Sequence, residues 1–197
     1  LRGWTAFSPN VLRRVDPGIL MIARTVIVSL IGMLLTGAAC DAAEAKKRPS
    51  LPASIVKTLD GKEWSIAEQN GRVSVLHFWS LNCQPCLAVL PRLRRLNGSW
   101  KDRSDVTLVS LPVNDDLIQV RRHVKQHRMA WPQLVTDKGS ALPTLLGPLG
   151  VKQMPTPHFW VVDVDGSIAG STTDVVKARK AAEQLALNAK AKNETKD

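Results

Sequence analysis

Two cysteines separated by two residues, Cys83 and Cys86, are the side chains of this sequence best suited to chemistry. At this spacing the two sulfur atoms can form a disulfide with each other, and a thiolate at one of them can attack a disulfide in another molecule. An ordinary cysteine, with a pKa near ~8.5, is mostly protonated at neutral pH. The pair therefore predicts dithiol–disulfide exchange if its surroundings stabilise one sulfur as the anion.

The residues around the pair predict a strand that leads into a helix. The apolar, β-branched run Val73–Trp79 is typical of a buried strand. Pro85 suits a first helical turn, and Asn97-Gly98 predicts the end of the helix. Cys83 should then lie at a helix N-terminus, where backbone N–H groups and the helix dipole stabilise a thiolate, and Cys86 should resolve the mixed disulfide. Between these ends, leucines recur at helical spacing: Leu87, Leu90, Leu93 and Leu96.

The same pair permits two other functional interpretations. Soft thiolates suit Cu(I), so Cys83, Cys86 and His158 are a candidate copper site or metallochaperone centre. A zinc site lacks further ligands near the pair, since His123 and His127 are expected to be solvated residues of one helix. The third alternative is an interaction module in which the cysteines form only a structural bond.

Further strands and helices alternate along the chain. Their order, with an antiparallel hairpin at the end, predicts an α/β fold with a mixed central sheet flanked by helices. Asp60-Gly61 predicts a β-hairpin that opens the domain. The expected elements are strands at 55–59, 62–66, 106–113, 159–163 and 167–170, and helices at 117–127 and 173–190.

Near the N-terminus, a charged residue, an apolar run and small residues follow one another as in a secretory signal: Arg24, Thr25–Leu35 and Thr36–Ala39. The apolar run is shorter than the ~20 residues that span a bilayer, which favours cleavage. An uncleaved anchor and a lipid on Cys40 are the alternatives. We therefore expect a periplasmic or other extracytoplasmic protein, soluble or tethered. The expected segments are a leader over 1–45 (1–20 upstream of a start at Met21, and 21–45 the signal or anchor), a linker over 46–54, a domain over 55–190 and a polar tail over 191–197.

Composition and charge restrict the class of protein further. The chain is 44% hydrophobic and 22% charged, as is typical of a folded globular protein. Its net charge of +10 is spread along the chain rather than gathered in one stripe with interleaved aromatic residues. No nucleic-acid partner is therefore expected.

Several motifs together resemble the periplasmic thioredoxin-like oxidoreductases of the TlpA/ResA group. The resemblance covers roughly 54–189 and implies a thioredoxin-like fold with an N-terminal β-hairpin extension. It also implies protein thiol-disulfide oxidoreductase activity with no cofactor beyond the redox-active disulfide Cys83–Cys86. Implied partners are periplasmic protein disulfides, which the chain would reduce, or, as the alternative, dithiols, which it would oxidise, together with a membrane-embedded electron donor or acceptor. The motifs are Asp60-Gly61, Phe78-Trp79, Cys83-Gln84-Pro85-Cys86, the helix-kinking Pro91, Thr156-Pro157 and Asp163-Val164-Asp165-Gly166.

The resemblance also implies where a substrate binds. The Thr156–Pro157 bond should be cis and face the cysteine pair, so that the Thr156 backbone pairs with an extended substrate segment. His158 either adjoins Cys83 or faces solvent. The immediate surroundings of the pair would be Gln84, Pro85, His77 and Trp79.

Three positions depart from the group's pattern. His77 stands where thioredoxins have a buried acid, and it is either a proton shuttle for Cys86 or a hydrogen-bonded core residue. Asn82 replaces a common tryptophan, which makes the surface less aromatic. Val89 replaces a glutamate that is usual in haem-protein maturation, which argues against a dedicated apocytochrome role.

Overall fold

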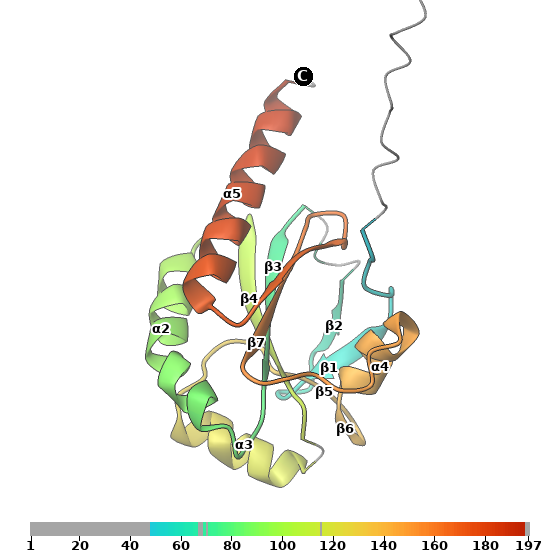
Figure 1. Cartoon of the computed structure of the whole chain (residues 1–197), viewed down its shortest axis with the longest axis vertical. Coiled ribbons are helices and arrows are strands. Elements are labelled where there is room, and N and C mark those ends of the chain that lie inside the picture. Colours follow the sequence, from blue (N-terminus) through green and yellow to red (C-terminus); the bar gives the residue numbers. More distant parts are fainter. Residues whose placement is uncertain (1–47, 67–68, 70, 115, 196–197) are drawn as a thin grey trace, which may run out of the picture. The chain divides into compact units, whose positions relative to one another are not determined.

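The computed structural model describes residues 48–195 except 67–68, 70 and 115. The leader expected over 1–45 lies outside these residues. No helix within the described part of the chain is long and apolar enough to span a membrane. Figure 1 shows the elements, which are β1 (Ile55–Thr58), β2 (Glu63–Ser65), β3 (Val73–Trp79), α2 (Gln84–Trp100), β4 (Val106–Pro112), α3 (Leu117–Gln126), β5 (Leu134–Thr136), β6 (Gly139–Ser140), α4 (Leu142–Leu146), the 3-10 helix η2 (Gly147–Leu149), β7 (His158–Val162), β8 (Ile168–Thr172) and α5 (Val175–Glu194).

The central sheet has the strand order β4-β3-β7-β8. Strand β3 pairs parallel with β4 and antiparallel with β7, so the sheet is mixed, as predicted. All seven residues of β3 are buried, because both faces of the sheet are covered. Helices α2, α3 and α5 contribute to the core on one face, and α4 with a second sheet contributes to the core on the other.

The second sheet has the order β2-β1-β5-β6 and contains the expected opening hairpin. Gly61 stands in the β1–β2 turn with φ of +88°, a conformation that glycine adopts without strain. A parallel bridge between Ser110 and Gln133 links this sheet to β4. The sequence did not predict β5, β6 or α4.

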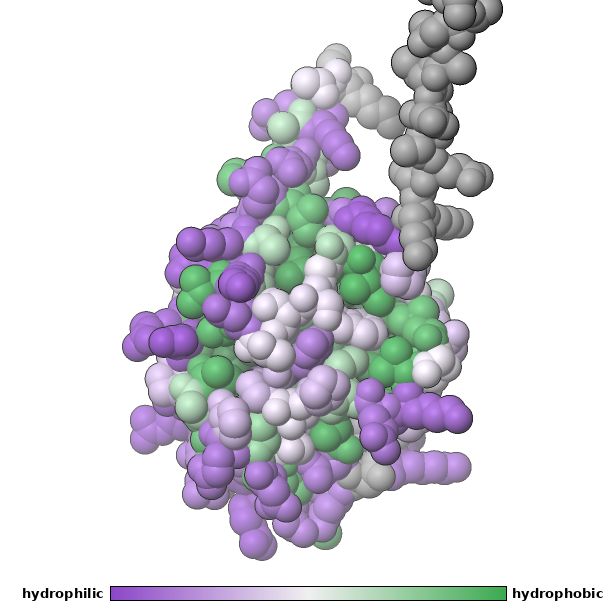
Figure 2. All heavy atoms as spheres, viewed as in Figure 1, coloured by the Kyte–Doolittle hydropathy of each residue, from purple (hydrophilic) through white to green (hydrophobic). Residues whose placement is uncertain are grey.

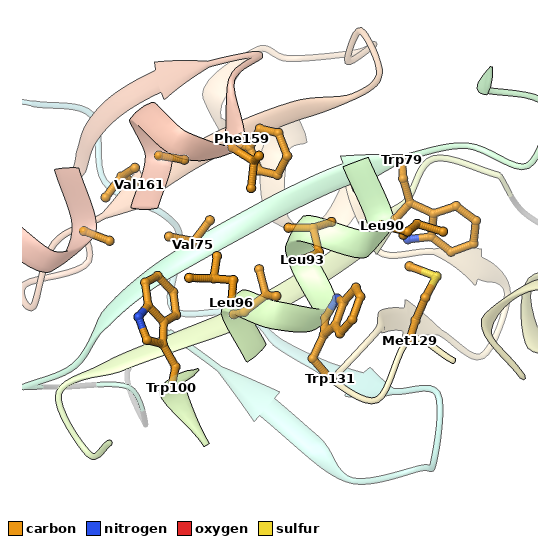
Figure 3. Packing of buried hydrophobic residues seen from close by; sticks show 14 of the residues in the cluster. Val75, Trp79, Leu90, Leu93, Leu96, Trp100, Met129, Trp131, Phe159 and Val161 are labelled. Atoms are coloured by element: carbon orange, nitrogen blue, oxygen red, sulfur yellow. The ribbon is translucent and has the colours of Figure 1, made fainter. Parts of the chain in front are cut away.

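Helix α2 positions the cysteine pair against the core. It continues through Pro91 and past Asn97-Gly98 to Trp100, so the predicted end at Asn97-Gly98 was wrong. Trp100 explains the extension, because its side chain is buried in the same cluster as the α2 leucines (Figure 3). Its indole N–H also donates to Glu183 on α5 at 3.2 Å.

Both ends of the domain extend beyond the boundaries expected from sequence. Within the expected linker, Ser50 forms an antiparallel bridge with Ser167, and the Leu51 N–H donates to the Gly166 carbonyl at 3.0 Å. Leu51 is buried, so this segment packs on the domain. At the other end, α5 continues to Glu194, into the expected polar tail.

Candidate active site

Cys83 and Cys86 lie where β3 leads into α2, and their sulfur atoms are joined in a disulfide. Cys83 is the N-cap of α2, and its Sγ accepts a hydrogen bond from the Cys86 backbone N–H at 3.1 Å. The first turn of α2 carries no acidic side chain. The positive end of the helix therefore acts on the Cys83 sulfur without an opposing carboxylate in that turn, which favours a thiolate after reduction.

The two cysteines differ in their access to solvent. Cys83 is 7% exposed and Cys86 is 3% exposed, while Gln84 and Pro85 between them are exposed. The loop before the pair is held by the Leu81 N–H, which donates to Asn114 Oδ1 at 2.8 Å. Both cysteines are thus buried, and the residue at the helix end is slightly more exposed than its partner.

The segment before β7 lies beside this loop. Ser80 Oγ and Thr156 Oγ1 are 3.3 Å apart, which brings together residues 76 positions apart in sequence. The Thr156–Pro157 bond is cis, the isomer that the resemblance implied. Both residues are half-buried, so the structure places a partly accessible backbone segment next to the cysteine loop.

His158 lies on the face of the central sheet opposite the one covered by α2. It pairs with Phe78, whose side chain lies in the core away from α2, and residues opposite each other in a sheet share a face. Its Nε2 lies 2.7 Å from Ser171 Oγ, and burial lowers the pKa of its imidazole.

No three His, Cys, Asp or Glu side chains within the described residues form a group that could hold a metal ion. The structure therefore does not bring Cys83, Cys86 and His158 together as a copper site.

His77 is fully buried on the face of the central sheet that α2 covers. Its Nδ1 lies 2.9 Å from Ser110 Oγ, which also accepts a hydrogen bond from the Trp131 indole at 2.7 Å. Among the described residues its Nε2 has no hydrogen-bond partner, and its ring stacks on Phe159 with centroids 5.0 Å apart. Burial lowers the pKa of His77 to about 3, so the imidazole is neutral near pH 7. A base this weak is poorly suited to take a thiol proton, which favours the core interpretation.

Trp79 ends strand β3 and is almost fully buried. Its indole N–H donates to Gln133 Oε1 at 3.1 Å, and Gln133 Nε2 donates to the Trp131 carbonyl at 2.9 Å. The ring of His123 on α3 also stacks on the indole. Burial, and then the neighbouring His127, lower the pKa of His123. The expectation that His123 is simply solvated was therefore wrong.

The polar partners of His77 and Trp79 were not among the residues singled out from sequence. Ser110 lies 33 positions from His77 and 21 from Trp131, and Gln133 lies 54 positions from Trp79. No local motif marks them, because their roles arise from the pairing of β3 with β4 and from the bridge between Ser110 and Gln133.

A mixed sheet, a cysteine pair at a helix N-terminus and a neighbouring cis-proline define the class of thioredoxin-fold proteins with a Cys-x-x-Cys site. The AhpC/TSA family matches residues 48–171, and the chain belongs to this family.

Curated relatives share a thiol-disulfide oxidoreductase name. The chain is 27% identical over 134 residues to the thiol-disulfide oxidoreductase ResA of Bacillus thuringiensis, covering 68% of this chain and 71% of the relative. It is 28% identical over 117 residues to ResA of Bacillus cereus, covering 59% and 64%, respectively. The sporulation thiol-disulfide oxidoreductase A of Bacillus subtilis is 27% identical over 123 residues, with 60% and 72% covered. The match thus spans just under two thirds of the Bacillus cereus protein.

Solved structures share the fold. The thioredoxin domain of a thiol-disulfide oxidoreductase from Bacteroides vulgatus superposes with a TM-score of 0.60 at 18% identity, covering 73% of this chain and 99% of that chain. A thioredoxin-family thiol:disulfide interchange protein from Chlorobium tepidum gives 0.57 at 23% identity, covering 71% and 98%. At these identities the likeness establishes the thioredoxin-like fold alone.

Proposed function

We propose that this chain is an exported protein thiol-disulfide oxidoreductase that works through Cys83 and Cys86. The observation that carries the proposal is the position of the Cys83 Sγ at the N-terminus of α2, bonded to the sulfur of Cys86 one turn later. The names of the curated relatives support the same reaction class.

In the proposed reaction, the Cys83 thiolate attacks one sulfur of a substrate disulfide, and the other substrate sulfur leaves as a thiolate. Cys86 then loses its proton and attacks the Cys83 Sγ, which releases the second substrate thiolate. The substrate gains two electrons, and Cys83 and Cys86 become the disulfide present in the structure. The attacking role of Cys83 is supported by its place at the helix end and its greater exposure.

We assign substrate binding to the segment at Thr156 and Pro157. Thr156 lies beside the cysteine loop through its contact with Ser80, and it stands two residues before the start of β7. An extended polypeptide can pair with a backbone in this position by β-augmentation, which gives affinity without demanding one substrate sequence. A protein disulfide is the substrate class that suits such a site.

The proposed direction is reduction outside the cytoplasm, with electrons supplied by a membrane-embedded partner. The TlpA/ResA resemblance supports this direction, and the signal-like segment over 21–45 supports export. The redox potential of the purified domain tests the direction. A value near ~−120 mV, typical of a strong oxidant, would indicate that the protein oxidises its substrates instead. The mass of the protein isolated from its host tests cleavage of the leader.

Cysteine variants test the reaction itself. Cys83→Ser should abolish the acceleration of insulin reduction by dithiothreitol that the wild-type protein provides, because it removes the attacking sulfur. Cys86→Ala should accumulate mixed disulfides with substrates, because the first step proceeds and the second cannot. Cys83→Ala is the matched control and should trap nothing. Trapping through Cys86 in the Cys83→Ala variant would show that the roles are reversed.

A further inference from the structure

A groove outside the cysteine site lies between α2 and α5. It has a volume of about 370 Å³ and is lined mainly by Arg92, Arg95, Leu96, Val175, Val176 and Arg179. We call these six residues the arginine groove. It has no part in the reaction proposed above.

The charges in the arginine groove all have one sign. Its charged lining residues are Arg92, Arg95 and Arg179, and no acidic side chain lines it within the described chain. Two carboxylates lie close to these arginines: Asp174, which caps α5, has its pKa lowered in part by the charge of Arg92, and Glu183 pairs with Arg179 at 3.0 Å. The first turn of the 20-residue helix α5 adds the positive end of its dipole. With three arginines against these two carboxylates, the groove keeps a net positive charge and favours a negatively charged ligand.

The lining between the arginines is apolar. Leu96 and Val175 are buried, whereas Val176 is 44% exposed and presents apolar surface at the groove. An apolar side chain of a ligand that covered Val176 would remove this surface from water. Guanidinium groups around an aliphatic patch match a segment in which acidic residues flank an apolar one.

The position of the groove links it to the cysteine pair. Arg92 follows Cys83 by nine residues, which is about 14 Å along a helix that rises ~1.5 Å per residue. A protein interface of ordinary size covers ~800 Å² on each partner, a patch roughly 30 Å across. A protein whose disulfide reacts at Cys83 is therefore large enough to reach the groove. In Figure 2, hydrophilic residues with apolar ones among them cover α2 and α5, and hydrophilic residues also cover other parts of this face.

We propose that the arginine groove binds an acidic segment with an apolar side chain on the protein that exchanges disulfides with Cys83. This inference rests on the proposed function and adds the chemical class of the partner. It predicts that recognition has two parts, a reactive one at the cysteines and an electrostatic one on α2 and α5.

Two synthetic peptides test the inference. Each closes a small disulfide loop and continues through a flexible Gly/Ser spacer that spans ~14 Å into a tail, which alternates Glu with Leu in one peptide and Lys with Leu in the other. The acidic tail should lower KM for reduction by about tenfold, and kcat should be the same for both peptides. The acidic tail alone, fluorescently labelled and without a disulfide, should also bind by anisotropy.

The matched variants carry the same change in net charge. Arg92→Gln/Arg95→Gln/Arg179→Gln should abolish both the KM advantage and tail binding, while Lys101→Gln/Lys138→Gln/Lys152→Gln should retain them. Equal KM values for the two peptides, an equal loss in both triple variants, or binding of anionic phospholipid vesicles in place of the acidic tail would overturn the proposal. If wild-type protein reduces neither peptide, the proposed function fails. The anisotropy of the labelled acidic tail, which has no disulfide, still shows whether the arginine groove binds it.

Discussion

The imidazole of His123 stacks on the indole of Trp79, with ring centroids 4.8 Å apart and ring planes 22° apart. On its polar edge, the same indole donates to Gln133 Oε1. Helix α3 and the segment before β5 thus hold the last residue of β3, from which the cysteine loop departs. The loop is positioned by elements that contain no part of the cysteine motif.

Trp79→Phe should test the contribution of this anchoring to stability. The substitution leaves the Gln133 carbonyl oxygen buried without its donor, which costs roughly 1–3 kcal/mol in addition to the lost packing. Urea unfolding measures the change. The control is Trp100→Phe, whose indole donates to Glu183, a carboxylate that is 28% exposed and accessible to water. Equal losses in the two variants would contradict the role given to Gln133.

The stability of the protein should depend on pH through His77. Its folded pKa is about 3, below the unfolded value of 6.5, so the unfolded state binds the proton more readily between these values. The free energy of unfolding should therefore fall as the pH is lowered from 6.5, by roughly 1.4 kcal/mol per pH unit.

Urea unfolding of wild type and His77→Asn from pH 7 to pH 4.5 measures this dependence. His123 and His158 also have lowered pKa values, but they remain in both proteins and cancel in the comparison. Parallel pH profiles would show that His77 is not protonated on unfolding in this range.

Asp105 should stabilise the loop between α2 and β4. It accepts two hydrogen bonds from Arg103 at 2.9 Å, and Lys190 on α5 lies 3.0 Å away. Hydrogen bonding to Arg103 lowers the pKa of Asp105, so its stabilisation is present above the unfolded value near 3.8 and is lost as the pH falls below it. Asp105→Asn should lower the free energy of unfolding by about 2 kcal/mol at pH 7.

The control for Asp105 is Asp137→Asn. Asp137 pairs with Lys57, but its side chain is 77% exposed, so its removal should cost under about 0.5 kcal/mol. If Asp105→Asn lowers the free energy of unfolding by no more than this at pH 7, the contacts of Asp105 with Arg103 and Lys190 stabilise the fold no more than a surface ion pair does.

Leu93 should be the most sensitive of the α2 leucines. It is fully buried under the central sheet, so Leu93→Ala leaves a cavity and should cost about 2–5 kcal/mol. Leu187→Ala on α5 is the control, since that side chain is 58% exposed and its loss should cost under about 0.5 kcal/mol. Thermal unfolding of the two variants gives the comparison, and similar melting temperatures would refute the assignment of Leu93 to the core.

The sequence predicted the elements whose patterns are local and strong. Strand β3 has a continuous apolar run, and α2 has a leucine repeat, so both were expected at nearly their observed positions. The end of α2 was missed because the stop signal at Asn97-Gly98 is weaker than the burial of Trp100. Strands β5 and β6 have three and two residues, too few for a periodic pattern, and they form through pairing with β1 and with each other.

For the candidate site, the sequence identified the cysteines but not their supports. Cys83, Cys86 and the Thr156–Pro157 segment carry recognisable motifs, and the structure brings the two loops together. Gln133 and Ser110 carry none, because a buried glutamine or serine resembles any other polar residue until its distant partner is known. The position of His158 next to Pro157 suggested a place beside Cys83. Side chains alternate between the faces of a strand, however, and that of His158 lies on the face of the sheet opposite α2.

Arg48 forms an ion pair with Asp163, and Ser50 bridges to Ser167, both beyond the end of β7 that is remote from Phe78 and the cysteine loop. Residue 48 is thus fastened at the pole of the domain opposite the sulfur atoms. A fluorophore, an affinity handle or a solid support coupled at that position would leave the reactive pole unobstructed, so the domain can be immobilised for single-molecule measurements of disulfide exchange.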